Sequence, residues 1–139
     1  MFKGVPLTLG VEEEYQIVDA ETRALDSYVS KILPDGRVRL QDQVKEEFMM
    51  SQIEVGSQVC ANIHEVRQEL CRLRGALIEI AESQGKRIVA AGTHPFSRWM
   101  EQTITPRLRY KALEENMQDI ARRLLIFGMH VHVASAIWN

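Results

Sequence analysis

The chain alternates between two patterns of apolar residues. Segments in which apolar residues recur at every second position are typical of β-strands, and recurrence every three or four positions is typical of α-helices. The strand pattern, or a short apolar run bounded by turn residues, predicts strands over 7–18, 48–55, 88–92 and 125–133. The helix pattern is clearest between the second and third of these strands, so the chain mixes both element types without internal repeats.

The best-defined helix is predicted to begin after Asn62 and to end at Gly85. Asn62 followed three residues later by Glu65 matches a capping box, and glycine followed by basic residues is a common helix end. Between these ends an apolar stripe recurs at spacings of three and four residues, which predicts a face packed against a core. The stripe consists of Ile63, Val66, Leu70, Leu73, Leu77 and Ile80.

The segment from 26 to 44 has a more ambiguous pattern. A short helix over 26–33 is one interpretation, with Asp26 or Ser27 as its cap. The sequence at 34–36, Pro-Asp-Gly, predicts a turn, and the apolar positions after it, at 38, 40 and 44, suggest a strand or a hairpin.

A second helix is predicted to start with Thr105 as cap and Pro106 in the first turn. Its expected buried face comprises Leu113, Met117, Ile120 and Leu124. With the last strand after it, the element order predicts an α+β fold, in which helices pack on one face of a largely antiparallel sheet. The 139 residues are expected to form a single domain.

Composition narrows the function classes. Apolar residues make up 45% and charged residues 26%, as in soluble globular proteins. The net charge of −2 gives no reason to expect a nucleic-acid or membrane partner, and no apolar run is long enough for a transmembrane helix. The two cysteines, Cys60 and Cys71, fit a reducing cytoplasm and are too few for a zinc module.

Three acids interrupt the first predicted strand. Glu12 and Glu14 share one face of this strand, whereas Glu13 points to the other, because successive side chains alternate. Two neighbouring carboxylates in a half-buried sheet repel each other, and a hard cation such as Mg²⁺ would relieve that repulsion. A solvated strand face, on which acids cost little, is the alternative.

Other candidate residues lie near predicted strands. Glu47 and Glu54 flank a strand seven residues apart, so they meet on one face only if a turn or bulge occurs near 50–51. His130 and His132 share a face of the last strand and can bind metal, move protons or donate to phosphate. A transition-metal site using both histidines and a carboxylate is a further alternative. Thr93 and His94 follow a strand and precede a proline, where loop residues often reach a cleft.

Five motifs in order carry a family resemblance. They are Gly-Val-Glu-Glu-Glu-Tyr at 10–15, Ser-Gln-Ile-Glu at 51–54, Gly-Thr-His-Pro-Phe at 92–96, Arg-Tyr at 109–110 and Gly-Met-His-Val-His-Val at 128–133. Together they resemble the carboxylate–amine ligases of the type 2 glutamate–cysteine ligase family, with a more distant likeness to glutamine synthetase.

The resemblance implies part of a glutamine-synthetase-like catalytic domain. It implies an ATP-dependent ligase that forms an amide through an acyl phosphate, with Mg²⁺ or Mn²⁺ as cofactor and an amino acid as substrate. By position, Glu12, Glu14, Glu54 and His130 are similar to metal ligands, and Glu47 is a less certain match. His132, Thr93, His94, Arg109 and Tyr110 match positions near nucleotide or substrate.

Members of this family are much longer than 139 residues, and later strands supply further ligands. We therefore expect this chain to be the N-terminal part of a longer catalytic domain, and turnover by this chain alone stays open. The alternative is a non-catalytic α+β module that assembles into a homo-oligomer through an open sheet edge.

Overall fold

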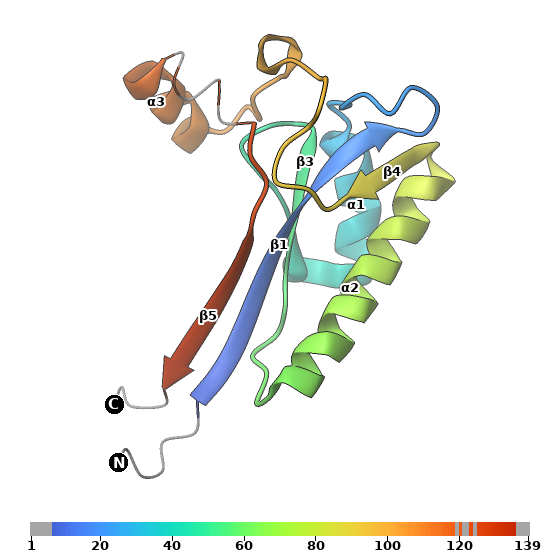
Figure 1. Cartoon of the computed structure of the whole chain (residues 1–139), viewed down its shortest axis with the longest axis vertical. Coiled ribbons are helices and arrows are strands. Elements are labelled where there is room, and N and C mark those ends of the chain that lie inside the picture. The colour runs from blue at the N-terminus through green and yellow to red at the C-terminus, as the bar shows by residue number, and fades with distance from the viewer. Residues whose placement is uncertain (1–6, 119, 121–122, 124, 136–139) are drawn as a thin grey trace.

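The fold is built around one long strand. The computed structural model describes residues 7–118, 120, 123 and 125–135, and within them β1 (Leu7–Asp19) is the centre of a five-stranded antiparallel sheet (Figure 1). On one side β1 pairs with β3 (Gln52–Gly56), which pairs in turn with β2 (Val44–Glu46). On the other side β4 (Lys86–Val89) and β5 (Met129–Ser135) pair with successive halves of β1. The predicted α+β class with an antiparallel sheet is thus confirmed.

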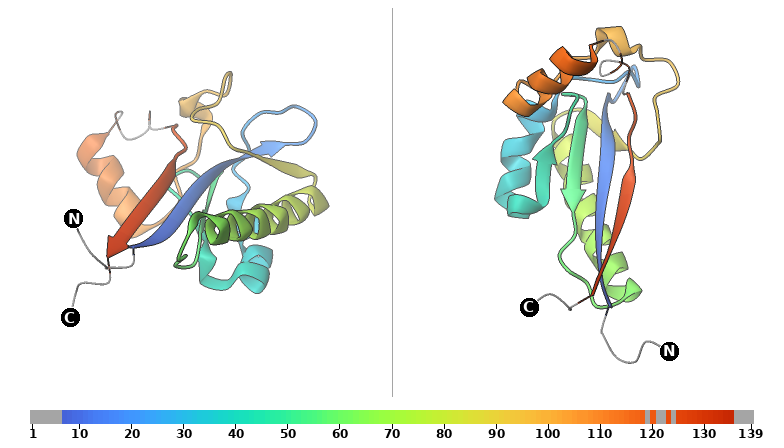
Figure 2. Two further views of the ribbon diagram at one scale, coloured as in Figure 1. Left: turned by 60° about the horizontal axis from the view of Figure 1, so that its bottom comes forward. Right: turned by 90° about the vertical axis from the view of Figure 1, so that its left-hand side faces the viewer.

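Two helices, α1 (Val29–Leu40) and α2 (Ile63–Ser83), cover one face of the sheet (Figure 2). Tyr15 and Ile17 of β1 point to this face, and Glu13 follows the same alternation. The side chains between sheet and helices form the main core and are 9% exposed or less. They are Tyr15, Ile17, Val29, Ile32, Leu33, Leu40, Val44, Ile53, Val55, Leu73, Leu77, Ile80 and Ala81.

The ends of α2 follow the local sequence signals. The Asn62 side chain accepts hydrogen bonds from the backbone N–H groups of His64 and Glu65, and Glu65 accepts from the N–H of Ala61. Gly85 has a φ of +69°, a conformation that a side chain disfavours, and it follows the last helical turn. The apolar stripe is confirmed except at its first position, because Ile63 is 65% exposed.

The turn and strand predicted over 34–40 are wrong, whereas the strand suggested at position 44 is present as β2. The Pro-Asp-Gly sequence lies inside α1, and so do positions 38 and 40. A proline at the sixth position of a helix removes one backbone hydrogen bond and costs about 3 kcal/mol. Burial of Val29, Ile32, Leu33 and Leu40 offsets this cost, since each buried apolar side chain contributes roughly 1.5–3 kcal/mol. Gly36 lets α1 approach β2, because a Cβ there would lie 3.3 Å from Val44 Cγ1.

The start of α1 also differs from expectation, because Tyr28 precedes the helix and gives no side-chain cap. A short 3₁₀ turn, η1 (Gln41–Gln43), then leads into β2.

Strand boundaries shifted as well. The strand expected over 48–55 begins only at Gln52, because Met50 and Ser51 form a turn. The strand expected over 88–92 is β4, which ends at Val89 and is not buried as predicted, since it lies at the sheet edge. The last strand begins at Met129 rather than at 125.

The third helix, α3 (Leu108–Met117), lies apart from the other two (Figure 1). It follows the 3₁₀ turn η2 (Trp99–Glu101), and Arg107 precedes it instead of the predicted Thr105, whose hydroxyl donates to the Glu47 carbonyl. Of its residues only Tyr110 is buried, and it packs in a second cluster with Phe48, Met49, Leu125 and Phe127.

The predicted buried face of this helix is therefore mostly wrong. Leu113 is partly buried, Met117 and Ile120 are exposed, and Leu124 lies outside the described residues. No helix among the described residues is long and apolar enough to cross a membrane, and both cysteines are free thiols.

Candidate metal centre on the carboxylate face

The face of the sheet opposite α1 and α2 gathers acidic side chains. Glu12 and Glu14 both point to it, and the strand register places Glu54 of β3 directly across from Glu14. On the other side of β1, the register of β1 with β5 places His130 opposite Glu12. We call the surface formed by Glu12, Glu14, Glu47, Glu54 and His130 the carboxylate face.

Glu47 reaches this face through the turn after it. Glu47, Glu14 and His130 line one cavity of about 300 Å³, whose apolar wall includes Phe48, Tyr110 and Phe127. A turn at 50–51, the condition stated for Glu47 and Glu54 to share a face, is present and separates Glu47 from the strand that carries Glu54. All five predicted metal-binding residues therefore lie in one region of the protein.

Like charges concentrate at Glu54. Its side chain is 14% exposed, and burial followed by the negative charge of Glu12 raises the pKa of its carboxyl above the ordinary value. The charges of Glu47 and Glu14 add to the rise, whereas Lys45, whose Nζ is 3.6 Å from Glu54 Oε1, lowers the pKa. A cation placed among these groups would remove the repulsion.

Protein groups already contact the carboxylates of β1. His132 Nε2 lies 3.1 Å and His130 Nδ1 3.8 Å from the same oxygen of Glu12. The N–H of Gly128 donates to Glu14 Oε2 at 2.9 Å. Among the described residues, no three acidic, histidine or cysteine side chains are arranged to hold a metal ion. The donor types fit a hard cation, but these side chains would have to turn from their present partners to bind one.

Arg109 and Tyr110 also contact this region. The Tyr110 hydroxyl donates to Glu47 Oε2 at 3.1 Å, and an Arg109 nitrogen lies 3.8 Å from the same oxygen. Burial raises the pKa of Tyr110 to about 12, so its phenol stays protonated. Both residues, which the family resemblance matched to positions near nucleotide or substrate, thus border Glu47.

Thr93 and His94 are not brought to the carboxylate face. The Thr93 hydroxyl donates to the Leu125 carbonyl at 3.0 Å. His94 Nδ1 accepts from the N–H of Ser97, so the neutral ring carries its proton on Nε2, 3.0 Å from the Arg23 carbonyl. Both ring nitrogens of His94 therefore hold the loop in place.

Gln52 is a residue of this region that sequence reasoning missed. It is 2% exposed, accepts from the N–H of Met49 and donates to the Ile126 carbonyl at 2.8 Å. These bonds fix the turn that carries Glu47 relative to the segment before β5. The available signal was a polar amide beside the apolar Ile53 in a segment expected to be buried.

Comparison with known proteins identifies the family. The model of glutamate–cysteine ligase family 2 matches residues 8–135. The chain belongs to this family. The protein named "Putative glutamate--cysteine ligase 2" in Herpetosiphon aurantiacus is 56% identical over 128 residues, and that in Roseiflexus castenholzii is 55% identical. Each alignment covers 92% of this chain, which spans about a third of each relative's length, 33% and 34%.

Solved structures share the fold. A crystal structure of glutamate–cysteine ligase from Francisella tularensis in complex with AMP matches with a TM-score of 0.76 at 13% identity. That match covers 96% of this chain and 28% of the other. A bifunctional glutathione synthetase from Pasteurella multocida matches with a TM-score of 0.63 at 15% identity, over 95% of this chain and 17% of the other. At these identities the likeness supports the fold, and family membership rests on the sequence match.

Proposed function

We propose that the chain supplies one wall of the active site of an ATP-dependent carboxylate–amine ligase of the glutamate–cysteine type. Glu12, Glu14, Glu54 and His130, with Glu47, would hold Mg²⁺ or Mn²⁺, and that cation would neutralise phosphate charge. The family's name and the AMP bound to the solved relative support a nucleotide and amino acids as ligands.

The proposed reaction has two steps. An oxygen of the substrate carboxylate attacks the terminal phosphorus of ATP, which gives an acyl phosphate and ADP. An amine then attacks the acyl carbon and displaces phosphate, which gives the amide. Tyr110 and Arg109, held against Glu47, would orient a ligand at the edge of the carboxylate face, and His132 would keep the Glu12 carboxylate in place.

One observation carries the proposal. Three carboxylates, those of Glu12, Glu14 and Glu47, gather around a fourth, Glu54, which is 14% exposed and whose pKa rises through burial and then through Glu12, Glu47 and Glu14. A solvated face gives no reason for such acids to gather, because like charges in a partly buried sheet repel each other.

Calorimetric titration with a non-hydrolysable ATP analogue, with and without Mg²⁺, tests this function. We expect Mg²⁺ to add a binding component that is absent in EDTA, and we expect this component to weaken at least tenfold in Glu12→Gln. Glu82→Gln, which removes the same charge from an exposed position near the end of α2, is the matched control. Mg²⁺-dependent affinity that is equal in both variants would exclude the carboxylate face as the binding site. Zinc binding that is lost in His130→Ala but unchanged in Glu12→Gln would instead favour a histidine-based site.

The exposed edge of β5 favours a second candidate, a non-catalytic module that self-assembles. All seven residues of β5 are exposed, and Met129, Val131 and Val133 form an apolar row, each about 60% exposed. An unpaired strand edge of this kind pairs readily with another chain. Sedimentation velocity, together with the titration above, separates the candidates. An oligomer that shows no Mg²⁺-dependent nucleotide binding supports the module, and a monomer that shows such binding supports the ligase wall.

A further inference from the structure

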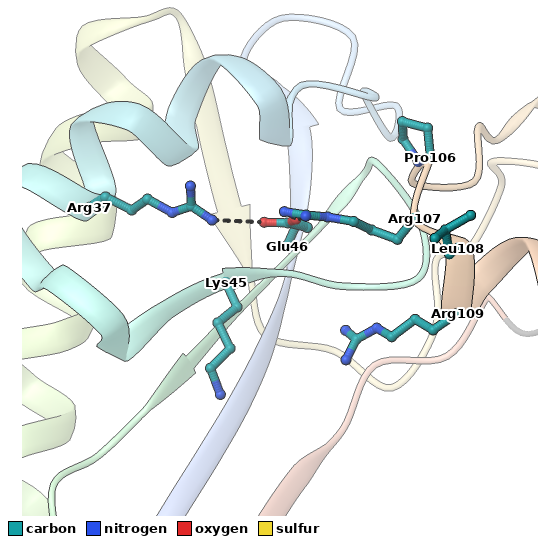
Figure 3. A pocket seen from close by; sticks show the side chains of 7 residues that line it. All are labelled: Arg37, Lys45, Glu46, Pro106, Arg107, Leu108 and Arg109. Carbon is teal, nitrogen blue, oxygen red and sulfur yellow. Dashed lines mark hydrogen bonds and ion pairs between the residues drawn. The ribbon is translucent and has the colours of Figure 1, made fainter.

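A cavity of about 620 Å³ lies beside β2, between α1 and the start of α3 (Figure 3). Its wall carries four cationic side chains and one carboxylate. Arg37 comes from α1, Lys45 and Glu46 from β2, and Arg107 and Arg109 from the beginning of α3. We call this the basic cavity.

The positive charge of the basic cavity is incompletely balanced. Glu46, 12% exposed, pairs with both Arg107 and Arg37, the latter at 3.4 Å. Because one carboxylate serves two guanidinium groups, each retains N–H donors that Glu46 cannot accept. Lys45 and Arg109 face carboxylates beyond the cavity wall, Glu54 at 3.6 Å and Glu47 at 3.8 Å. Both approach distances are longer than a hydrogen bond, so these two cations also keep donors for a ligand.

The N-terminus of α3 forms part of the same wall. Pro106 and Leu108, on either side of Arg107, both line the cavity. The α3 helix has ten residues, Arg107 provides no side-chain cap, and its first turn holds no acid. The first backbone N–H groups of a helix attract anions, and in the described part of the chain neither the cap residue nor the first turn of α3 supplies one.

An apolar pocket of about 330 Å³ adjoins the basic cavity. The two share Glu46, Pro106 and Arg107, and the apolar pocket is further lined by Val29, Leu33 and Met50. A ligand with a highly charged chain and a less polar end would find matching surfaces side by side. The combined size falls in the range of small-molecule sites.

We propose that the basic cavity binds an oligophosphate chain without needing a divalent cation. Guanidinium groups form paired hydrogen bonds with phosphate oxygens, and several linked phosphates match four cations better than a single carboxylate does. The oligophosphate is either the tail of a nucleotide or a free inorganic chain. This site goes beyond the proposed function, because its contacts come from cationic side chains and need no metal ion. Arg37 and Arg107 have no part in the carboxylate face, whereas Lys45 and Arg109 lie where the two sites adjoin.

Calorimetry with inorganic triphosphate in EDTA tests the proposal. We expect Arg37→Gln and Arg107→Gln each to weaken binding at least fivefold. Arg39→Gln is the control for charge alone, since Arg39 lies on the same helix but pairs with Glu79 outside the cavity at 2.7 Å. Glu46→Gln should tighten binding, because it releases two guanidinium groups, whereas Glu79→Gln should leave it within twofold.

Two results would overturn the proposal. One is the absence of binding by the wild-type protein at millimolar triphosphate. The other is an equal loss of triphosphate affinity in Arg37→Gln and Arg39→Gln, which would indicate attraction by charge alone. A folding defect in Arg37→Gln or Arg107→Gln would show in circular dichroism. In that case the comparison of Glu46→Gln with Glu79→Gln tests the proposal, and equal triphosphate affinity in these two variants would overturn it.

A non-hydrolysable ATP analogue in EDTA distinguishes the two sources. Tighter binding than triphosphate means that the apolar pocket holds the nucleoside, and equal affinity means that only the phosphate chain is recognised. Because the ligase proposal is tested by Mg²⁺-dependent binding and Glu12→Gln, either proposal can fail without the other.

Discussion

The ion pair between Glu13 and Arg74 should anchor the strand that presents Glu12 and Glu14. Glu13 is the middle acid of the three and points to the opposite face, where its side chain is 6% exposed. It accepts hydrogen bonds from Tyr15 and from two nitrogens of Arg74 of α2, one of them at 2.9 Å. The pair thus joins α2 to β1 directly behind the carboxylate face.

Replacing Glu13 by glutamine should cost about 2–3 kcal/mol of folding stability. The amide keeps the shape but has one acceptor oxygen, so at least one bond from Arg74 is lost, and a hydrogen bond to a charged group contributes about 1.5–3 kcal/mol. A fully buried pair would cost about 3–5 kcal/mol, but Arg74 is 48% exposed and its freed charge stays in water. Tyr15→Phe removes the bond donated to Glu13 and the bond accepted from Arg74 Nε at 3.0 Å, and should cost about 1–2 kcal/mol. Arg74→Met leaves a buried carboxylate unpaired and should cost more than Glu13→Gln.

Urea unfolding at pH 7 measures these differences. A loss of 2–3 kcal/mol moves the midpoint by about 1–1.5 M urea for a slope of about 2 kcal/mol per M. Burial alone would raise the pKa of Glu13, but hydrogen bonds from Arg74 and Tyr15 hold it below the ordinary 4.5. The stabilisation is therefore present above pH 4.5 and is lost as the pH falls through the lower, folded-state pKa. A cost of Glu13→Gln below about 0.5 kcal/mol, or a smaller cost of Arg74→Met than of Tyr15→Phe, would refute this account.

Three further changes have defined outcomes in the same unfolding assay. Leu73→Ala should cost about 2–5 kcal/mol because Leu73 is fully buried, whereas Leu108→Ala, at 87% exposure, should cost little. Asn62→Ala should cost about 1 kcal/mol, since it removes the cap of α2, and should lower helix content in circular dichroism. Glu54→Gln should stabilise the protein at pH 7. The raised pKa of Glu54 means that its contribution to stability falls as pH rises above 4.5, so the gain should vanish below that pH.

The sequence predicts α2 well because its signals are local, and it fails to predict α1 because its local signals favour a turn. The cap at Asn62, the end at Gly85 and the stripe between them all lie within the helix itself. In α1 the local signal, Pro34 followed by Asp-Gly, favours a turn, and what overrides it is packing of Ile32 and Leu33 against strands distant in sequence. Tertiary burial of this kind leaves no mark in a short window of sequence.

The candidate site divides in the same way. That Glu12 and Glu14 share a face follows from strand geometry alone. That Glu54 lies opposite Glu14 depends on the register of β1 with β3, and that Glu47 joins them depends on the turn fixed by Gln52. The family resemblance could indicate Glu54 and Glu47 in advance, because related proteins share the fold that brings these positions together. The periodicity of a single segment holds no information about contacts with other segments.

The basic cavity could not be predicted by either route. Arg37 lies in the helix whose sequence favoured a turn, and Lys45 and Arg107 are 62 positions apart in the chain, so no local spacing links them. These side chains can meet because β2 lies at the sheet edge, where no further strand covers it among the described residues.

Protection of this edge is a structural reason for part of the charge. Lysine side chains and salt bridges at an exposed strand edge disfavour pairing with the strand of another chain. Such protection does not account for Arg37 and Arg107 converging on the single carboxylate of Glu46, because guarding an edge requires charge but not two guanidinium groups on one acid. The excess of donors over acceptors at that point is what favours a ligand, and the opposite effects expected of Glu46→Gln and Arg107→Gln follow from it.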